Sequence, residues 1–126
     1  MPFIHIKSLP FEEQVEMASI ITYVATDFSD KTKIELEHIH TTWEFYRPGH
    51  YAKGGLAADY QPENNYPIIV DLLTPDFNDL KVIAVMLESI ASSISKSVNF
   101  PIKNIFINHR PALSGMVFDD GKVVKW

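Results

Sequence analysis

The chain opens with a short stretch, Pro2 to Lys7, in which apolar and polar side chains alternate, and this period of two predicts a β-strand. The period changes at Ser8-Leu9-Pro10, where a Ser cap and a Pro in the first turn predict the start of a helix. Apolar residues then recur at spacings of three and four, on one helical face: Phe11, Val15, Ala18, Ile21, Ala25 and Phe28. We expect this helix to end at Ser29-Asp30-Lys31.

The next segment, Ile34 to Tyr46, is rich in β-branched and aromatic residues and predicts a long strand. Its alternation slips by one position in the middle, and a β-bulge near Glu37 or His38 would reconcile the two parts. The stretch that follows, Arg47 to Tyr66, contains several Gly and Pro turns, and we expect a long loop of the functional or mobile kind.

A second strand and helix follow this loop. Pro67 to Leu73 is almost entirely apolar, as in a central strand that is buried on both faces. Thr74-Pro75-Asp76 predicts the next helix start, with Asp76 and Asp79 resembling a capping box. This helix has the cleaner apolar stripe, formed by Leu80, Ile83, Leu87, Ile90 and Ile94. We expect it to end at Asn99-Phe100-Pro101.

The last part predicts a strand over Lys103 to Asn108, a break at Arg110-Pro111 and a terminal hairpin that turns at Asp119-Asp120-Gly121. The order is therefore β-α-β, loop, β-α-β and hairpin, which looks like a duplicated unit over residues 2–46 and 67–108. Two right-handed crossovers then give an α+β fold: one domain over residues 1–126, with a four-stranded sheet and both helices on one face. The other face must be covered, most simply by another copy of the chain.

The composition excludes several classes of protein. The chain has 126 residues, of which 46% are hydrophobic and 21% charged, as in an ordinary globular domain. Its formal charge of −5 argues against nucleic acid or an anionic membrane as the partner. Without any Cys it has no disulfide, Cys nucleophile or iron–sulfur cluster. The N-terminus lacks a signal-peptide pattern, and the longest apolar run, Val82 to Leu87, is too short to span a membrane, so we expect a cytoplasmic protein.

Pro2 is the most informative single residue. Met1 is normally removed before a residue as small as proline, which would leave a secondary amine at the start of a strand. Burial and nearby cations both disfavour the charged form of an amine, and a neutral amine near pH 7 can act as a general base. On the dipeptide alone, a common Met-Pro start without a catalytic role is the simpler interpretation.

Histidines offer a second kind of chemistry. His38 and His40 would share a strand face in the absence of a bulge, and with His5 or His109 they could form a metal site. No further ligand stands at a recognised spacing, so surface or packing roles are the simpler interpretation. We expect no metal and no cofactor. The sequence contains none of the common phosphate-loop, dinucleotide, serine-hydrolase or zinc-protease motifs.

Over essentially its whole length, the chain resembles the tautomerase superfamily, which includes 4-oxalocrotonate tautomerase (4-OT), 5-carboxymethyl-2-hydroxymuconate isomerase and macrophage migration inhibitory factor (MIF). Besides the duplicated unit, three segments carry the resemblance. They are Met1-Pro2 directly before a strand, Gly54-Gly55 ahead of the second unit, and Ile105-Phe106-Ile107-Asn108 after the second helix. The chain is most similar to a small bacterial branch of this superfamily.

The resemblance implies an MIF-like homotrimer in which three sheets form a central core. It also implies that Pro2 is the catalytic base, which moves a proton between an enol and its keto form. By position, Lys31 and Asn108 resemble substrate-binding residues of the family, and Arg110 lies beside Asn108 without a firm counterpart. The implied substrate is a small 2-oxo or 2-hydroxy unsaturated carboxylic acid, and no cofactor is needed.

Two alternatives stay open. A non-catalytic interaction protein of the same fold is suggested by two departures from the family pattern: Ser8-Leu9-Pro10 where short members carry an Arg, and Phe106 where a Tyr is often found. A ferredoxin-like dimeric α/β barrel shares the β-α-β-β-α-β order and would bind haem or a small molecule. In that case His38, His40 or His109 would be the candidate site residues.

Overall fold

The computed structural model describes residues 1–126. It contains two α-helices, eight strands and two short 3₁₀ helices, η1 and η2. In chain order these are β1 (Phe3–Ser8), α1 (Met17–Thr32), η1 (Leu36–His38), β2 (His40–Phe45), β3 (Tyr51–Lys53), β4 (Leu56–Ala58), β5 (Ile68–Pro75), α2 (Leu80–Ser97), η2 (Ile102–Asn104), β6 (Ile105–Ala112), β7 (Val117–Asp119) and β8 (Lys122–Val124).

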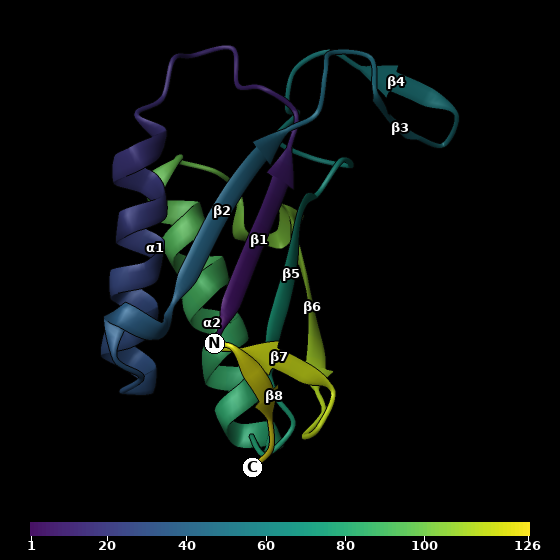
Figure 1. The fold of residues 1–126 in the computed structure, drawn as a ribbon. Helices are drawn as coiled ribbons and strands as arrows, with labels where there is room; N and C mark the ends of the chain where they lie inside the picture. Colours follow the sequence, from purple (N-terminus) through teal and green to yellow (C-terminus); the bar gives the residue numbers. More distant parts are fainter.

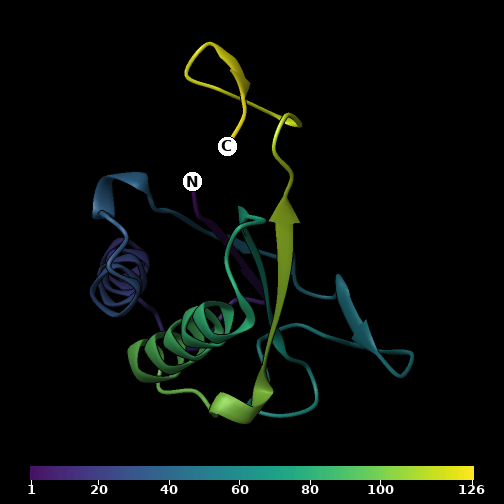
Figure 2. The ribbon, with the colours of Figure 1, turned by 90° about the horizontal axis from the view of Figure 1, so that it is seen from below.

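Four of the strands form one mixed sheet in the order β2-β1-β5-β6. β1 runs parallel to β2, and β5 runs parallel to β6, whereas the two central strands, β1 and β5, are antiparallel. Figures 1 and 2 show both helices on the same side of this sheet. The predicted α+β architecture, a four-stranded sheet with two helices on one face and a terminal hairpin, is therefore confirmed.

The strand order also decides against one alternative fold. In a ferredoxin-like, split β-α-β unit, another strand separates the two strands that a helix connects. Here β2 lies directly beside β1, and β6 lies directly beside β5. The ferredoxin-like alternative is therefore wrong.

The two halves of the chain repeat one structural unit. β3 begins at Tyr51 and β7 at Val117, 66 residues later, and the same offset relates η1 to η2 and β4 to β8. The turns before the hairpins match as well, because Gly49 and Gly115 adopt φ angles of 81° and 82°, in the region that favours glycine. Each half is thus β-α-β followed by a hairpin, and the two hairpins lie at opposite ends of the sheet (Figure 1).

Strand pairing follows the same repeat. Phe3 of β1 pairs with His40 of β2, and Ile69 of β5 pairs with Phe106 of β6. The two pairs are related by the offset of 66 residues, so the two parallel strand pairs have the same register. Because β1 and β5 are antiparallel, the two units are related by a pseudo-twofold axis through the middle of the sheet. Equivalent residues near the strand ends therefore lie at opposite ends of the sheet, whereas His5 and its equivalent Asp71 pair with each other near the axis.

α1 begins later than predicted, at Met17 rather than after Ser8-Leu9-Pro10. Contacts from a distant loop hold that segment in an irregular path. The Leu9 N–H donates to the Gln61 side chain at 2.9 Å, and the Gln61 N–H donates to the Pro10 carbonyl at 2.8 Å. These tertiary hydrogen bonds satisfy backbone groups that a helix would otherwise use.

The segment before β2 is a 3₁₀ turn rather than part of a long strand. The Ile39 N–H donates to the Leu36 carbonyl at 3.1 Å and closes η1, and β2 begins only at His40. This turn by itself shifts the apolar alternation by one position. The predicted bulge near Glu37 or His38 is therefore wrong.

The predicted loop from Arg47 to Tyr66 contains the β3–β4 hairpin. Two tyrosines fasten this hairpin: the Tyr51 hydroxyl donates to the Pro67 carbonyl at 2.9 Å, and the Tyr66 hydroxyl donates to the Leu56 carbonyl at 2.7 Å. The two rings also meet edge to face, with their centroids 5.5 Å apart. Burial raises the pKa of the Tyr51 hydroxyl. The hairpin is thus an ordered arm of the molecule.

α2 is capped by Asp79 rather than Asp76. The Val82 N–H donates to the Asp79 carboxylate at 2.9 Å, and the helix starts at Leu80. The Asp76 carboxylate instead accepts the indole N–H of Trp126 at 2.7 Å, which ties the last residue to the loop between β5 and α2.

β6 continues through Arg110-Pro111, where a break was predicted, to Ala112. An edge strand tolerates a proline, because the missing N–H can fall on its unpaired side. The predicted terminal hairpin is present as β7 and β8. Neither helix combines the length and the apolar character that a membrane crossing requires.

The core lies between the sheet and the two helices. It consists of Ile4, Ile6, Val24, Phe28, Ile68, Val70, Leu72, Met86, Ile90, Ile94 and Phe100. Each large apolar side chain that is fully buried here contributes about 1.5–3 kcal/mol. The opposite face of the sheet carries no helix (Figure 2).

Candidate active site

Pro2 stands directly before β1 and is buried. Its carbonyl accepts the His40 N–H of β2 at 2.9 Å, which fixes it to one neighbouring strand. On the other side, Phe3 pairs with Leu73 of β5, so the next step along this antiparallel ladder sets Pro2 opposite Thr74. By strand alternation, the Pro2 ring and the Thr74 side chain share the helix-covered side of the sheet.

The helix-free side near Pro2 is aromatic. The Phe3 ring stacks on His40 with centroids 4.4 Å apart, and on His5 at 5.9 Å. The His5 Nδ1 lies 2.8 Å from the Thr42 hydroxyl. His38 belongs to η1 and His40 to β2, so the two histidines do not form the strand-face pair that the spacing suggested.

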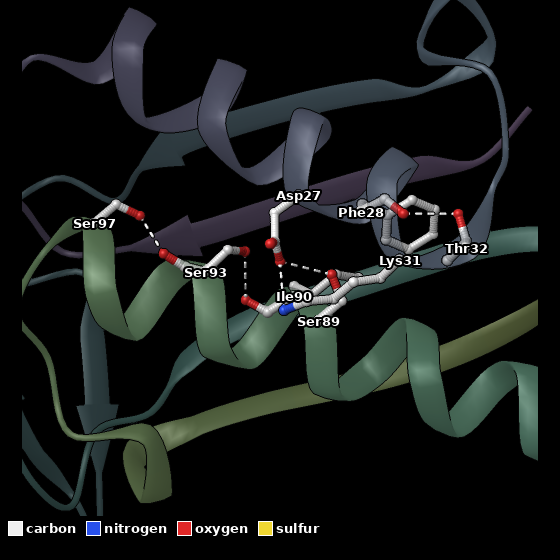
Figure 3. Close-up of polar contacts among 8 residues, drawn as sticks. All are labelled: Asp27, Phe28, Lys31, Thr32, Ser89, Ile90, Ser93 and Ser97. Atoms are coloured by element: carbon white, nitrogen blue, oxygen red, sulfur yellow. Dashed lines mark hydrogen bonds and ion pairs between the residues drawn. The ribbon is translucent and has the colours of Figure 1, made fainter.

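Lys31 lies in the last turn of α1, in the helical layer. Its ammonium group is 3.0 Å from the Asp27 carboxylate, and the same carboxylate oxygen accepts the Ser89 hydroxyl of α2 at 3.0 Å (Figure 3). Lys31 is thus part of a polar link between the two helices. A substrate carboxylate would have to compete with Asp27 for it.

Asn108 and Arg110 lie on β6 and are exposed on the helix-free side of the sheet. The Arg110 guanidinium holds the Asp71 carboxylate with two hydrogen bonds, from Nη2 at 2.7 Å and from Nε at 3.3 Å. This pairing lowers the pKa of the Asp71 carboxyl. It also occupies the Nε–Nη2 edge of the guanidinium, one of the edges through which Arg binds a carboxylate with two hydrogen bonds.

One chain therefore does not bring all four predicted residues together. Pro2 lies at the end of the central strands, Lys31 belongs to the helical layer, and Asn108 and Arg110 face away from the helices. A single site can use all of them only if it includes residues of more than one chain.

The Asp71–Arg110 pair predicts how stability changes in acid. An unfolded Asp titrates near pH 4, and the folded pKa of Asp71 is lower. The pair's contribution to stability is therefore complete above about pH 4 and is lost as the pH falls through the lowered pKa.

We expect Asp71→Asn to reduce the free energy of unfolding by about 1 kcal/mol or less at pH 7, because the pair is exposed. Urea denaturation should show this difference shrinking towards about pH 2.5. An equal difference at both pH values would contradict the assignment.

No protein-family model matches the chain, and no functionally curated protein matches its sequence. Among solved structures, the F6 fused 4-OT wild-type asymmetric trimer matches with a TM-score of 0.83 and 12% identity, over 96% of this chain and 94% of that one. The chain has the tautomerase fold. The sequence resemblance is thus confirmed at the level of the fold.

Two further structures with the tautomerase fold cover the chain almost completely. Pt0534 inactivated by 2-oxo-3-pentynoate matches with a TM-score of 0.80 and 8% identity, over 97% of this chain and 94% of that one. MIF from Oncomelania hupensis matches with a TM-score of 0.75 and 11% identity, over 98% and 82%. With so little identity, this likeness establishes the tautomerase fold and leaves the chemistry to be argued from the residues.

A polar cluster that sequence patterns did not reveal lies beside Pro2. The Thr74 side chain is fully buried, and its Oγ1 lies 2.7 Å from Nε2 of His109 on β6. The Asn78 amide donates to this Oγ1 at 3.3 Å and to the Pro75 carbonyl at 3.0 Å. Burial lowers the pKa of His109 despite the opposing field of Asp71. No local signal joins residues 35 positions apart, so only the strand register could have shown this contact.

The exposed cluster Glu35, Glu37 and His38 brings three metal-ligating groups within 4.8 Å of one another around η1. All three side chains are exposed, and an acidic surface turn of this kind is common without an ion. His40 and His109 are engaged elsewhere, with Phe3 and Thr74. The cluster of metal-ligating groups thus lies on an exposed turn.

Two hollows on the single chain lie away from Pro2. One, of about 440 Å³, includes Phe11, Glu12, Glu13 and Glu63 at the far end of the sheet. The other, of about 340 Å³, opens on the helix-free face between His5, Lys7, Thr42, Glu44 and Asp71. A substrate pocket at Pro2 would therefore need walls from a neighbouring chain.

Exposed apolar residues mark surfaces for such a neighbour. Phe106 on the edge strand β6 is exposed, as are Met116, Phe118 and Val123 on the terminal hairpin. Large exposed apolar side chains that gather on one hairpin are typical of an association surface. This pattern favours self-association over a monomer.

Proposed function

We propose that this protein is a keto–enol tautomerase that acts on a small 2-oxo or 2-hydroxy unsaturated carboxylic acid, with the N-terminal amine of Pro2 as the general base. The observation that carries the proposal is the position of Pro2: it is buried at the start of a central strand in a chain with the tautomerase fold. Removal of Met1 turns its nitrogen into a secondary amine. Burial disfavours protonation of an amine, which keeps it available as a base near neutral pH.

The reaction needs one group that carries a proton. The neutral Pro2 amine removes a proton from the carbon beside the 2-oxo group, and the Pro2 ammonium then gives this proton to the enolate oxygen, which forms the enol and regenerates the amine. In the reverse direction the amine takes the proton of the enol hydroxyl, and the ammonium returns it to carbon. Cationic and polar groups stabilise the negative charge that develops on the enolate oxygen.

Substrate binding falls to Lys31 together with Asn108 or Arg110. The Asn108 amide makes no side-chain hydrogen bond within the chain, so it is available to a ligand. Lys31 and Arg110 are held by Asp27 and Asp71, and these pairs must loosen when a substrate carboxylate enters. Because the residues lie on different faces of one chain, we place the site between chains.

We propose a homotrimer as the assembly that forms this site. The similar F6 fused 4-OT structure is described as a trimer, and the uncovered sheet face and the exposed terminal hairpin offer the contact surface. We expect native mass spectrometry to give three times the chain mass of 14.4 kDa.

Phe118→Asp tests the hairpin as part of this interface. Phe118 is 73% exposed in the single chain, and a carboxylate buried at an apolar interface is strongly unfavourable. We expect the variant to shift from trimer to monomer at micromolar concentration in sedimentation velocity. Leu80→Asp is the matched control, because Leu80 is 83% exposed at the start of α2. Dissociation by Leu80→Asp alone would place the interface on the helices instead.

The catalytic proposal is tested with phenylenolpyruvate, whose enol-to-keto conversion is followed by absorbance. The protein must be untagged, and its intact mass must show that Met1 is absent. Conversion above the buffer rate supports the proposal. No conversion by a protein with a free Pro2 would reject a general tautomerase activity.

The second candidate is a non-catalytic interaction protein with the same fold. One observation favours it: the two cationic candidates, Lys31 and Arg110, are already paired with carboxylates of their own chain. This alternative predicts the trimer without turnover, so the phenylenolpyruvate assay distinguishes the two.

A further inference from the structure

The two halves of the structural repeat each form a side-chain hydrogen bond at equivalent positions, but between different chemical groups. In the first half, the Trp43 indole N–H donates to the Ser8 hydroxyl at 3.0 Å. In the second half, His109 Nε2 lies 2.7 Å from the Thr74 hydroxyl. Both contacts join residues 35 positions apart, and both hydroxyl residues are fully buried. His109 is therefore the second half's counterpart of Trp43.

The two pairs lie at opposite ends of the sheet, and only one lies at Pro2. The β1–β5 ladder sets Thr74 opposite Pro2. By the same ladder, Ser8 stands opposite Ile68, which has no nitrogen that can become a terminal amine. The end of the sheet that carries the proposed base is thus the end where a histidine replaces a tryptophan.

The replacement changes what the hydrogen bond can do. An indole N–H only donates, whereas an imidazole nitrogen accepts when it carries no proton and donates when it carries one. The Thr74 hydroxyl has one proton to donate, and its oxygen lies 2.7 Å from His109 Nε2 and 3.4 Å from the Pro75 carbonyl. In the neutral tautomer whose Nε2 carries no proton, the Thr74 hydroxyl donates to His109 over the shorter distance, while its oxygen accepts the Asn78 amide at 3.3 Å. Protonation of His109 reverses this bond and turns the Thr74 proton away.

The surroundings of His109 favour the neutral ring. Burial lowers its pKa, and the field of Asp71 opposes this only in part, because Asp71 is paired with Arg110 on the other face of the sheet. Neutral His109 therefore holds Thr74 in one orientation at neutral pH.

We propose that His109, acting through the Thr74 hydroxyl, is a positioning residue for Pro2. The neutral ring orders Thr74 and, through Asn78, the loop that follows β5, so that the end of β1 is held in one geometry. The imidazolium disturbs this order and adds a positive charge two strands away from the amine. This role rests on the proposed function of Pro2 as base, although the coupling between the two groups can be measured without turnover.

The expected coupling is measurable. Two strand spacings place His109 about 10 Å from Pro2. At that distance, a unit charge shifts the titration of the amine by roughly 0.3 to 1 pH unit, depending on the local dielectric. The charged ring lowers the affinity of Pro2 for its proton.

His109→Gln and Thr74→Val, made in the full chain without Met1, test the proposal. Gln keeps a hydrogen-bonding tip but cannot gain a charge, whereas Val keeps the shape of Thr and removes the hydroxyl. The readouts are the pH profile of kcat/KM with phenylenolpyruvate and the NMR titration of ¹³C-labelled Pro2. Ser8→Ala, which removes the equivalent hydroxyl at the far end, is the matched control.

We expect His109→Gln to retain kcat/KM at pH 8 to within about threefold, because the hydrogen bond survives. On the acid side of its pH profile, log kcat/KM of His109→Gln should fall by one unit per pH unit, because only Pro2 gains a proton. In the wild type this slope should steepen to two, because His109 gains a proton as well. Thr74→Val should lower kcat/KM by about tenfold at pH 8, and by less in acid, where protonated His109 no longer orders Thr74 in the wild type. Ser8→Ala should leave the profile unchanged. In the wild type, the ¹³C chemical shifts of Pro2 should change in two pH ranges, one for Pro2 and one for His109. In His109→Gln they should change in one.

Identical acid limbs and identical Pro2 titrations in the wild type and His109→Gln would overturn the proposal. An equal effect of Ser8→Ala and Thr74→Val would also overturn it, because it would show a general packing effect. If the protein has no activity but Pro2 still senses His109, the proposed function fails and the coupling stands. If it is active without that coupling, only the positioning role fails.

Discussion

Protein that retains Met1 is expected to have a kcat/KM for phenylenolpyruvate about 10²–10⁴-fold below that of protein that begins at Pro2, the usual contribution of a general base. In the Met1 form the Pro2 nitrogen belongs to a peptide bond and has no basic lone pair. The fold is unaffected, because Pro2 still accepts the His40 N–H through its carbonyl. Parallel assays of the two forms, separated by intact mass, measure this difference.

Pro2→Ala supplies the control for this experiment. After removal of Met1, this variant carries a primary amine in place of the proline nitrogen, so it should retain more activity than the Met1 form and less than the wild type. Circular dichroism and the trimer mass should match among the three proteins. Equal activity of the Met1 form and the processed form would show that the Pro2 amine is not the base.

Phe28→Ala is expected to lower the free energy of unfolding by about 3–5 kcal/mol, the usual cost of removing a buried aromatic ring from a core. Phe28 is fully buried on the inner face of α1, within the cluster that joins both helices to the sheet. Its loss leaves a cavity that the two packed layers cannot close. Urea denaturation at one fixed protein concentration measures the change, since the stability of an oligomer depends on concentration.

Tyr23→Ala is the matched control for the core prediction. Tyr23 lies on the same helix but is 41% exposed, so its removal should cost about 1 kcal/mol or less. Similar losses for the two variants would mean that α1 does not pack as described.

Much of the fold could be predicted from apolar periodicity. The alternation in residues 2–7, the apolar run that forms β5 and the stripe on α2 each report a buried surface at the spacing of a strand or a helix. The terminal hairpin followed from its Asp-Gly turn. These features are local, so a single sequence contains them.

Features that depend on distant contacts could not be predicted in this way. Gln61 holds the Leu9–Pro10 segment out of the helix from 52 positions away. η1 broke the alternation that looked like a bulge. The duplicated unit was expected over residues 2–46 and 67–108, but its offset of 66 residues and its second hairpin came only from the element bounds.

The candidate site shows the same division. Pro2 could be singled out because its chemistry depends only on its place at the start of the chain. The contact between Thr74 and His109 and the ion pair between Arg110 and Asp71 depend on strand register. They could therefore be identified only in the structure. Lys31 was chosen by resemblance, and its link to Asp27 and Ser89 depends on helix packing.

The most direct test of the central claim is covalent trapping of Pro2 with 2-oxo-3-pentynoate, the compound that inactivates the similar structure Pt0534. The processed protein is incubated with the compound, and its N-terminal peptide is analysed by mass spectrometry. If Pro2 is a neutral, accessible amine in an active site, the label appears on Pro2 in proportion to the loss of activity and is absent from the Met1 form. An N-terminal peptide that stays unmodified while its Pro2 is free would contradict the account.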